Sequence, residues 1–246
     1  MSVQKKSQKI SSVYSITVLL FIFVSFLKAE NIIINKTVIS KSSVIGNSSV
    51  VINSKETKPQ KALKKGDLKK VKKEIPCKLD KISVSLPDFK LYIKNDKKCL
   101  IKLPLFLSKK MILDNDFIKI ADNRNIPLKI EIYSKYFEKL ELNGNYSLIL
   151  DKTLPKTEIE STGEGVIEIT SKTDKIYLNL VGDFKINIDK NVDFLSIDYT
   201  GDIDLTMQKA SRLNIKGTGD IKISLIDTPA KFQKDVVGDI KIDKRK

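Results

Sequence analysis

Residues 176–188 read IYLNLVGDFKINI, a stretch with a glycine at its centre and apolar residues at alternate positions on both sides. The alternating apolar residues are Ile176, Leu178, Leu180, Phe184, Ile186 and Ile188. Successive side chains of a β-strand point to opposite faces, so this pattern indicates strands with one buried and one solvated face. The glycine between them, Gly182, indicates a bend in the chain.

The same unit recurs six times from about residue 138, each time with a glycine that is usually followed by an acidic residue. The glycines are Gly144, Gly163, Gly182, Gly201, Gly219 and Gly238, at spacings of 19, 19, 19, 18 and 19 residues. A period near 20 with strand-like alternation is typical of a solenoid. A unit of 19 residues is too short for a strand–helix–strand crossover with a full helix.

The apolar positions of successive units form columns. The column two residues after the glycine contains Tyr146, Gly165, Phe184, Ile203, Ile221 and Ile240. Aligned columns at a constant period are what stacked parallel strands require, with neighbours about 4.8 Å apart. We therefore predict an all-β fold, a single-stranded parallel β-helix (solenoid) with coils of about 19 residues. Lys234 and Lys244 occupy normally apolar columns in the last unit, as expected for a polar terminal coil.

The column of acidic residues next to the glycines has two interpretations. Aspartate beside a glycine bend can hydrogen-bond to nearby backbone, which is a structural role. Stacked carboxylates also repel one another, so a cation such as Ca²⁺ is the alternative occupant of the column. The candidate ligands are Asp183, Asp202, Asp220 and Asp239. The structural interpretation is favoured, because calcium-binding β-helices use a shorter repeat of nine residues.

The region before the repeats contains short alternating segments separated by turn signals. We expect it to form an irregular, strand-rich N-terminal cap on the solenoid, in one domain that spans residues 74–246. Cys77 and Cys99 are the only cysteines of the chain. Export would place them in an oxidising compartment, so we predict a disulfide between them, with two free thiols as the alternative.

The N-terminus has the pattern of a secretory signal. Lysines precede an apolar stretch from Val13 to Leu27, which is too short to span a bilayer as a straight helix, and small Ala29 follows. Residues 1–29 are therefore predicted to be a signal peptide cleaved after Ala29, with an uncleaved anchor as the alternative. This predicts an exported protein, located in the periplasm or at the cell surface.

Two polar segments separate the signal from the domain. Residues 30–54 are rich in Ser, Asn and Val, and predict short strands or a semi-ordered tail with little bulk for a core. Residues 55–73 contain nine Lys and two acidic residues, and predict a solvated linker. The alternative role of this Lys-rich segment is docking to an anionic envelope surface. Membrane contact is expected only through the signal or this segment.

The order of strands and the later Gly-acid units resemble the bacterial head GIN domain family, named for autotransporter adhesins. The resemblance covers roughly residues 70–243 and rests on units such as STGEGVIEI (161–169), LVGDFKINI (180–188) and GTGDIKISL (217–225). Two units, at Gly182 and Gly238, depart from the pattern, with Val in place of Ser or Thr before the glycine. The resemblance implies an exported β-helix-like fold, and no catalytic residues come with it.

Composition narrows the possible functions. The chain has no His, so it lacks Ser–His–Asp or Cys–His catalysis. Its +15 net charge invites a nucleic-acid function, but only three Arg are present and the Lys-rich segment has no interleaved aromatic residues. We therefore expect no nucleic-acid partner and no cofactor. The prediction is a non-enzymatic, adhesin-like or scaffold module for an envelope protein or glycan. The alternatives are a polysaccharide-acting enzyme and an envelope structural protein that docks through its Lys-rich segment.

Overall fold

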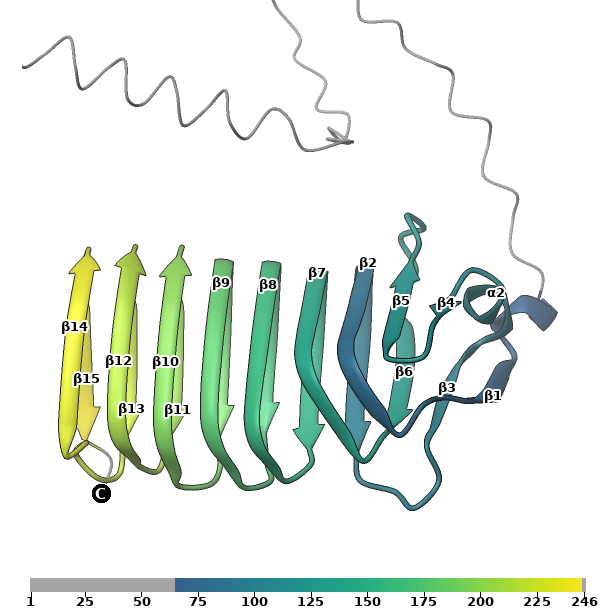
Figure 1. The fold of residues 1–246 in the computed structure, drawn as a ribbon. Helices are drawn as coiled ribbons and strands as arrows, with labels where there is room; N and C mark the ends of the chain where they lie inside the picture. The colour runs from purple at the N-terminus through teal and green to yellow at the C-terminus, as the bar shows by residue number, and fades with distance from the viewer. Residues whose placement is uncertain (1–64, 245–246) are drawn as a thin grey trace, which may run out of the picture. The chain divides into compact units, whose positions relative to one another are not determined.

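The computed structural model describes residues 65–244, which are almost entirely β-structure (Figure 1). The predicted signal, its cleavage point at Ala29, the tail and residues 55–64 lie outside the described residues. The all-β solenoid predicted from the repeat is confirmed. Its coils stack side by side, and equivalent residues of neighbouring coils pair in register (Figure 1).

Each regular coil runs through two β-segments that meet at the glycine of its repeat. In β7 (Tyr136–Asp151), β8 (Leu154–Ile169) and β9 (Thr173–Ile188) one continuous strand passes through the bend. The last three coils are each divided at the bend into two strands, namely β10 (Val192–Thr200) and β11 (Ile203–Met207), β12 (Ala210–Thr218) and β13 (Ile221–Leu225), and β14 (Lys231–Val237) and β15 (Ile240–Lys244). All pairings between these coils are parallel.

The core lies between the two β-segments of each coil, and the predicted apolar columns fill it. In β9 and its neighbours the inward side chains, such as Ile186, Leu205 and Ile223, have an exposed fraction of 0%. Burial of a side chain of this size contributes about 1.5–3 kcal/mol, and the contribution repeats in every coil. Because each coil contacts only its neighbours, the stability of the domain is distributed along the stack.

The first coils do not follow the order of the chain. Strand β2 (Lys78–Lys94) pairs with β7 on one side, and on the other side it pairs with β5 (Phe117–Ala121) and β6 (Leu128–Tyr133). All three pairings are parallel, so β5 and β6 together form a coil outside β2 (Figure 1). The chain therefore forms β2, returns to build the outer coil, and then crosses β2 to begin the regular repeats.

A small antiparallel region covers this outer coil. Strand β3 (Leu100–Pro104) pairs with β6 and with β1 (Lys70–Glu74), and β4 (Ile112–Leu113) pairs with β5. The short helices η1 (Lys65–Leu68) and α2 (Leu105–Ser108) flank these strands. The region before residue 138 thus contains both irregular parallel coils and an antiparallel cap.

The structure corrects the expected end of the Lys-rich linker. Residues 70–73 were expected to belong to that linker, but they form most of β1. Val71 packs against the core and pairs with Leu103 of β3, so the ordered backbone extends further toward the N-terminus than the lysines suggested. The flanking lysines are solvated on the other face of this edge strand, where charge blocks further pairing.

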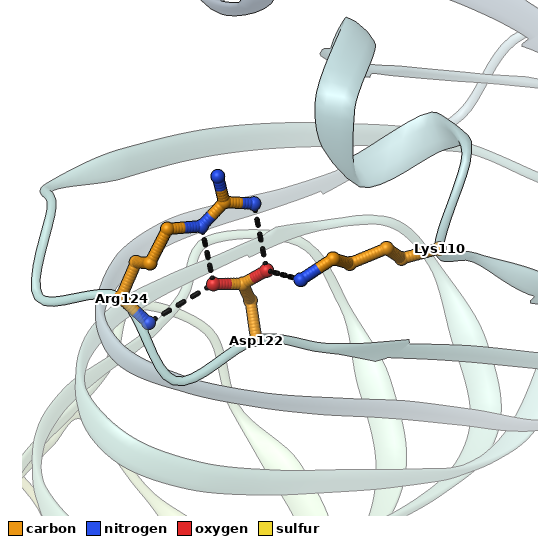
Figure 2. Close-up of polar contacts among 3 residues, drawn as sticks. All are labelled: Lys110, Asp122 and Arg124. Carbon is orange, nitrogen blue, oxygen red and sulfur yellow. Dashed lines mark hydrogen bonds and ion pairs between the residues drawn. The ribbon is translucent and has the colours of Figure 1, made fainter. Parts of the chain in front are cut away.

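Two cross-links fix the cap to the coils. Cys77 and Cys99 form a disulfide with a Cα–Cα distance of 5.1 Å, which joins the start of β2 to the start of β3. In the loop after β5, Asp122 accepts hydrogen bonds from the side chains of Arg124 and Lys110 (Figure 2). Burial alone would raise the pKa of Asp122, but these cationic partners outweigh it and hold the pKa below its usual value. The Arg124 guanidinium also lies 4.0 Å from the centre of the Phe106 ring.

Candidate binding groove

The six glycines of the repeat form a column along one edge of the solenoid, and each adopts a backbone conformation that other residues rarely adopt. All six glycines have positive φ between 119° and 142°. A Cβ atom on Gly182 would lie 1.8 Å from the carbonyl oxygen of Gly163, and the other five glycines face a neighbouring carbonyl in the same way. Both the bend and the close stacking of coils therefore require glycine, as the sequence predicted. The residues next to the glycines consequently repeat at the spacing of the coils along this edge.

The four candidate metal ligands lie in a column beside the glycines, and three of their carboxylates accept hydrogen bonds from backbone N–H groups. The backbone N–H of Asp202 donates to Asp183 Oδ1 at 3.1 Å, that of Asp220 donates to Asp202 Oδ1 at 3.1 Å, and that of Asp239 donates to Asp220 Oδ1 at 3.0 Å. The carboxylates of Asp183, Asp202 and Asp220 thus each receive a hydrogen bond from the next coil. Among residues 65–244, no group of three or more His, Cys, Asp or Glu is arranged to hold a metal ion.

A groove of about 680 Å³ runs along this edge and crosses several coils. One column of its lining contains the carboxylates of Glu164, Asp183, Asp202 and Asp220, which are exposed. The outward column two residues further along each coil contains Lys90, Ser147, Val166, Lys185, Asp204 and Lys222, so its three exposed ammonium groups are separated by other side chains. The groove therefore has a row of carboxylate acceptors along the axis of the solenoid and, beside it, a mixed column with three cationic donors.

Beneath the groove lies a row of aromatic side chains from neighbouring coils. The Phe89 and Tyr146 rings are stacked with centroids 5.4 Å apart, and the Tyr146 and Phe184 rings are tilted at 6.2 Å. Gly165 occupies the same column, and a Cβ there would lie 2.9 Å from the Tyr146 ring, so the ring occupies the space of the missing side chain. The Tyr146 hydroxyl donates to Ser161 Oγ at 2.7 Å, and burial raises its pKa.

A second, smaller hollow lies on the other side of the glycine bend. It has a volume of about 340 Å³ and is lined by residues of β8, β9 and β10 such as Glu160, Asn179 and Asp198. Its polar lining matches the outward face that the alternation predicted. The two hollows lie on either side of the glycine column.

The sequence predicted the acidic column but missed the groove itself. The aromatic row could not be predicted from the sequence, because Phe89 belongs to β2 and no repeat in the sequence indicates that β2 pairs with β7. The alternation predicts only that the neighbouring outward column is polar, and this column contains Lys185, Asp204 and Lys222. A signal was nevertheless present, since Lys185 and Lys222 follow their Gly-Asp pairs at the same distance.

The fold and the groove define a class of protein: a parallel β-solenoid that presents a polar, repetitive surface. The match to a family model over residues 54–230 shows that the chain belongs to the head GIN domain family, described as "Putative auto-transporter adhesin, head GIN domain". The expected resemblance is thereby confirmed. A comparison with curated proteins finds no match.

Solved structures that resemble this chain include proteins from Bacteroides and Parabacteroides species. A "putative adhesin" from Bacteroides fragilis has a TM-score of 0.51 and 15% identity, over 71% of this chain and 96% of that one. A "putative adhesin" from Parabacteroides merdae has a TM-score of 0.42 and 13% identity, over 74% and 98%. A "putative lipid binding protein" from Parabacteroides distasonis has a TM-score of 0.41 and 15% identity, over 74% and 98%. At these identities the comparison with the Bacteroides fragilis protein supports the fold alone.

Among the described residues, no helix is long and apolar enough to cross a membrane. The predicted signal or anchor at residues 13–27 lies outside those residues.

Proposed function

We propose that this chain is an exported, non-enzymatic, adhesin-like module that binds an extended polar ligand, most simply a glycan chain of the cell envelope, along the bend-edge groove. The observation that carries the proposal is the row of carboxylates in that groove, with the lysines of the neighbouring column beside it. The carboxylates accept from hydroxyl groups and repeat from coil to coil, and the ammonium groups donate to the same ligand. A ligand that itself repeats can therefore make the same contacts several times, and weak contacts add up through multivalency.

The acidic column supports binding rather than hydrolysis. A glycosidase requires two carboxylates that face one cleft, one as an acid and one as a base or nucleophile. Here Asp183, Asp202 and Asp220 each accept a hydrogen bond from a backbone N–H of the next coil. These carboxylates therefore stabilise the stacking of the coils at the bend. The family name and the predicted signal peptide support a location outside the cytoplasm.

The test is a glycan array combined with a pull-down from isolated envelopes, using the chain from Glu30 onward. We expect selective retention of an envelope glycan that is recovered intact after prolonged incubation. A protein partner alone would contradict the glycan part of the proposal. Failure to retain anything above background, or release of shortened glycan products, would overturn it.

A further inference from the structure

The N-terminal end of the stack has a basic outer face. Strands β1, β3, β6 and β2 lie next to one another there, in that order (Figure 1). Their inward side chains, such as Ile101, Ile132 and Leu91, have an exposed fraction of 0%, so the residues between them point outward. Apart from Lys90, which lines the groove, the charged and aromatic outward residues are Lys70, Lys72, Glu74, Tyr92, Lys94, Lys102, Lys129, Glu131 and Tyr133. This basic cap face thus has five lysines and two carboxylates.

The strand register joins these side chains into one continuous surface. Lys72 of β1 pairs with Lys102 of β3, and Lys102 pairs with Glu131 of β6. Glu131 pairs in turn with Tyr92 of β2. Neighbouring strands lie about 4.8 Å apart, so the four strands span about 14 Å. The ammonium groups therefore form an array across several strands and do not converge on a single point.

One carboxylate of the basic cap face is surrounded by three of its lysines. A carboxylate oxygen of Glu131 lies 3.0 Å from the ammonium of Lys129, and the other oxygen lies 3.5 Å from that of Lys102. The ammonium of Lys70 lies 4.0 Å away. Burial alone would raise the pKa of Glu131, but the lysines and the Tyr133 hydroxyl outweigh it and lower the pKa to about 2. Three ammonium groups around one ionised carboxylate leave an excess of positive charge.

Two tyrosine rings lie among these lysines. The Lys102 ammonium lies 4.4 Å from the centre of the Tyr133 ring, and the Lys129 ammonium lies 4.5 Å from the centre of the Tyr92 ring. Both tyrosines are partly exposed. Tyrosine has an apolar ring and a polar hydroxyl, and it is enriched where a membrane meets water. Lysines with tyrosines between them therefore match the chemistry of a membrane surface.

The basic charge belongs to this end of the solenoid alone on this side of the sheet. The outward charged residues on the same side of β11, β13 and β15 are Asp204, Lys222, Lys241 and Asp243. Their charges cancel. Neither the groove nor the second hollow is lined by a residue of β1, β3 or β6. A chain ligand is held best in a groove, whereas an open array of ammonium groups fits a layer of phosphate groups.

The most basic segment of the sequence runs directly into this face. Residues 55–73 contain nine Lys and two acidic residues, and their last part forms β1 with Lys70 and Lys72. Clusters of lysines are attracted to anionic lipid headgroups. The Lys-rich segment and the basic cap face are therefore consecutive in the chain and have the same preference for anionic surfaces.

We propose that the basic cap face docks on a membrane surface that contains anionic phospholipids, with its ammonium groups bound to the lipid phosphates. The folded cap then adds to the contact expected from the Lys-rich segment and holds the N-terminal end of the solenoid at the membrane. Attraction of this kind is screened by salt. The inference does not depend on the ligand of the groove, so either can fail without the other.

The test is co-sedimentation of the chain from Glu30 onward with two kinds of vesicle. One contains phosphatidylglycerol and phosphatidylcholine in equal parts, and the other contains phosphatidylcholine alone. The test variant carries Lys72→Glu and Lys94→Glu, because the ion pairs of Glu131 come from other lysines and the cap should fold as in the wild type. The control variant carries Lys172→Glu and Lys190→Glu in exposed loops between coils, with the same change of charge. Urea unfolding of both variants verifies that they are folded.

We expect the wild type to bind the anionic vesicles, and the test variant to bind them at least about tenfold more weakly than the control variant. High salt should release the wild type, and neutral vesicles should not retain it. Equal binding by the two variants would assign the lipid contact to the Lys-rich segment alone and overturn the proposal. Equal retention on neutral vesicles, or binding to a soluble anionic polysaccharide without binding to the anionic vesicles, would overturn it as well.

Discussion

At the scale of the residue, the six bend glycines hold the coils at their observed separation. Each lies against a carbonyl oxygen of the neighbouring coil, so a side chain there would push two coils apart as well as strain the backbone. This explains why glycine recurs although its neighbours vary from Asn to Glu and Asp.

Gly182→Ala is predicted to lower the free energy of unfolding by at least about 2 kcal/mol, since a residue forced into this conformation costs about 1–3 kcal/mol before any clash is counted. The measurement is urea unfolding followed by circular dichroism. Gly66→Ala serves as the control, because nothing lies within 4 Å of its added methyl group. Equal stability of the two variants would contradict the role of the glycine column.

Asp122 gives the cap a dependence on pH. Its side chain is 0% exposed and its pKa is held below the usual value by Arg124 and Lys110 (Figure 2). A carboxyl whose folded pKa is depressed stabilises the fold above its unfolded pKa, and this contribution is lost as the pH falls toward the folded pKa. Asp122→Asn should therefore cost about 2 kcal/mol at pH 7, the size of charge-assisted hydrogen bonds, and less below pH 4.

Urea unfolding of Asp122→Asn and wild type at pH 7 and pH 3 measures this difference. Asp80→Asn, an exposed carboxylate in β2, is the control and should change little at either pH. A difference for Asp122→Asn that stays constant with pH would show that packing, and not charge, accounts for the loss.

At the scale of the element, the disulfide supports the part of the fold with the fewest repeated contacts. It closes a loop with a sequence separation of 22 between Cys77 and Cys99, beside the irregular strands β1 and β3. Replacing both cysteines by alanine should destabilise the cap by about 3 kcal/mol, the loop-closure entropy of a chain of this length.

Because the regular coils contact only their neighbours, this loss should be local. Hydrogen exchange is expected to rise in β1, β3 and β6 while β9 and β10 keep their protection. Uniform loss of protection along the whole stack would contradict a solenoid in which stability is distributed coil by coil.

The pairing of the regular coils could be predicted because equivalent apolar residues recur in the sequence at a nearly constant spacing. Columns at a fixed spacing allow only one pairing of neighbours, so Ile186 must meet Ile167 and Leu205. The N-terminal elements lack that constraint. No local sequence pattern indicates that β2 lies between the β5–β6 coil and β7. The lysines of β1 indicated a linker, although Val71 packs against the core. In both regions, pairing with strands distant in the sequence determines the structure.

Buried polar residues were equally hard to predict. Lys152 lies in the turn between β7 and β8 with an exposed fraction of 0%, and its ammonium donates to Asn95 Oδ1 at 2.8 Å and to the Ser134 carbonyl at 2.7 Å. Burial lowers its pKa to about 8. The sequence does not distinguish Lys152 from the other lysines. Its burial could not be predicted, because the acceptors of its ammonium group lie in other loops of the chain.

At the scale of the whole molecule, the solenoid converts a short repeat into long surfaces. The acidic column could be predicted as a row, since Asp183 and Asp202 occupy equivalent positions. The groove could not be predicted, because its lining combines the acidic column, the lysines of the neighbouring column, the aromatic residues below and strand β2. The candidate binding surface is therefore a property of the stacked coils and cannot be identified from one repeat alone.

The central claim is that the bend-edge groove is the binding surface. The most direct measurement is the affinity for the retained envelope glycan of a variant with Lys185→Glu and Lys222→Glu. We expect affinity to fall at least about tenfold, or about 1.4 kcal/mol, because two donors are lost and two further negative charges are added beside the acidic row. The control variant, with Lys172→Glu and Lys190→Glu in exposed loops between coils, carries the same charge change. Binding by the groove variant at the level of that control would contradict the account.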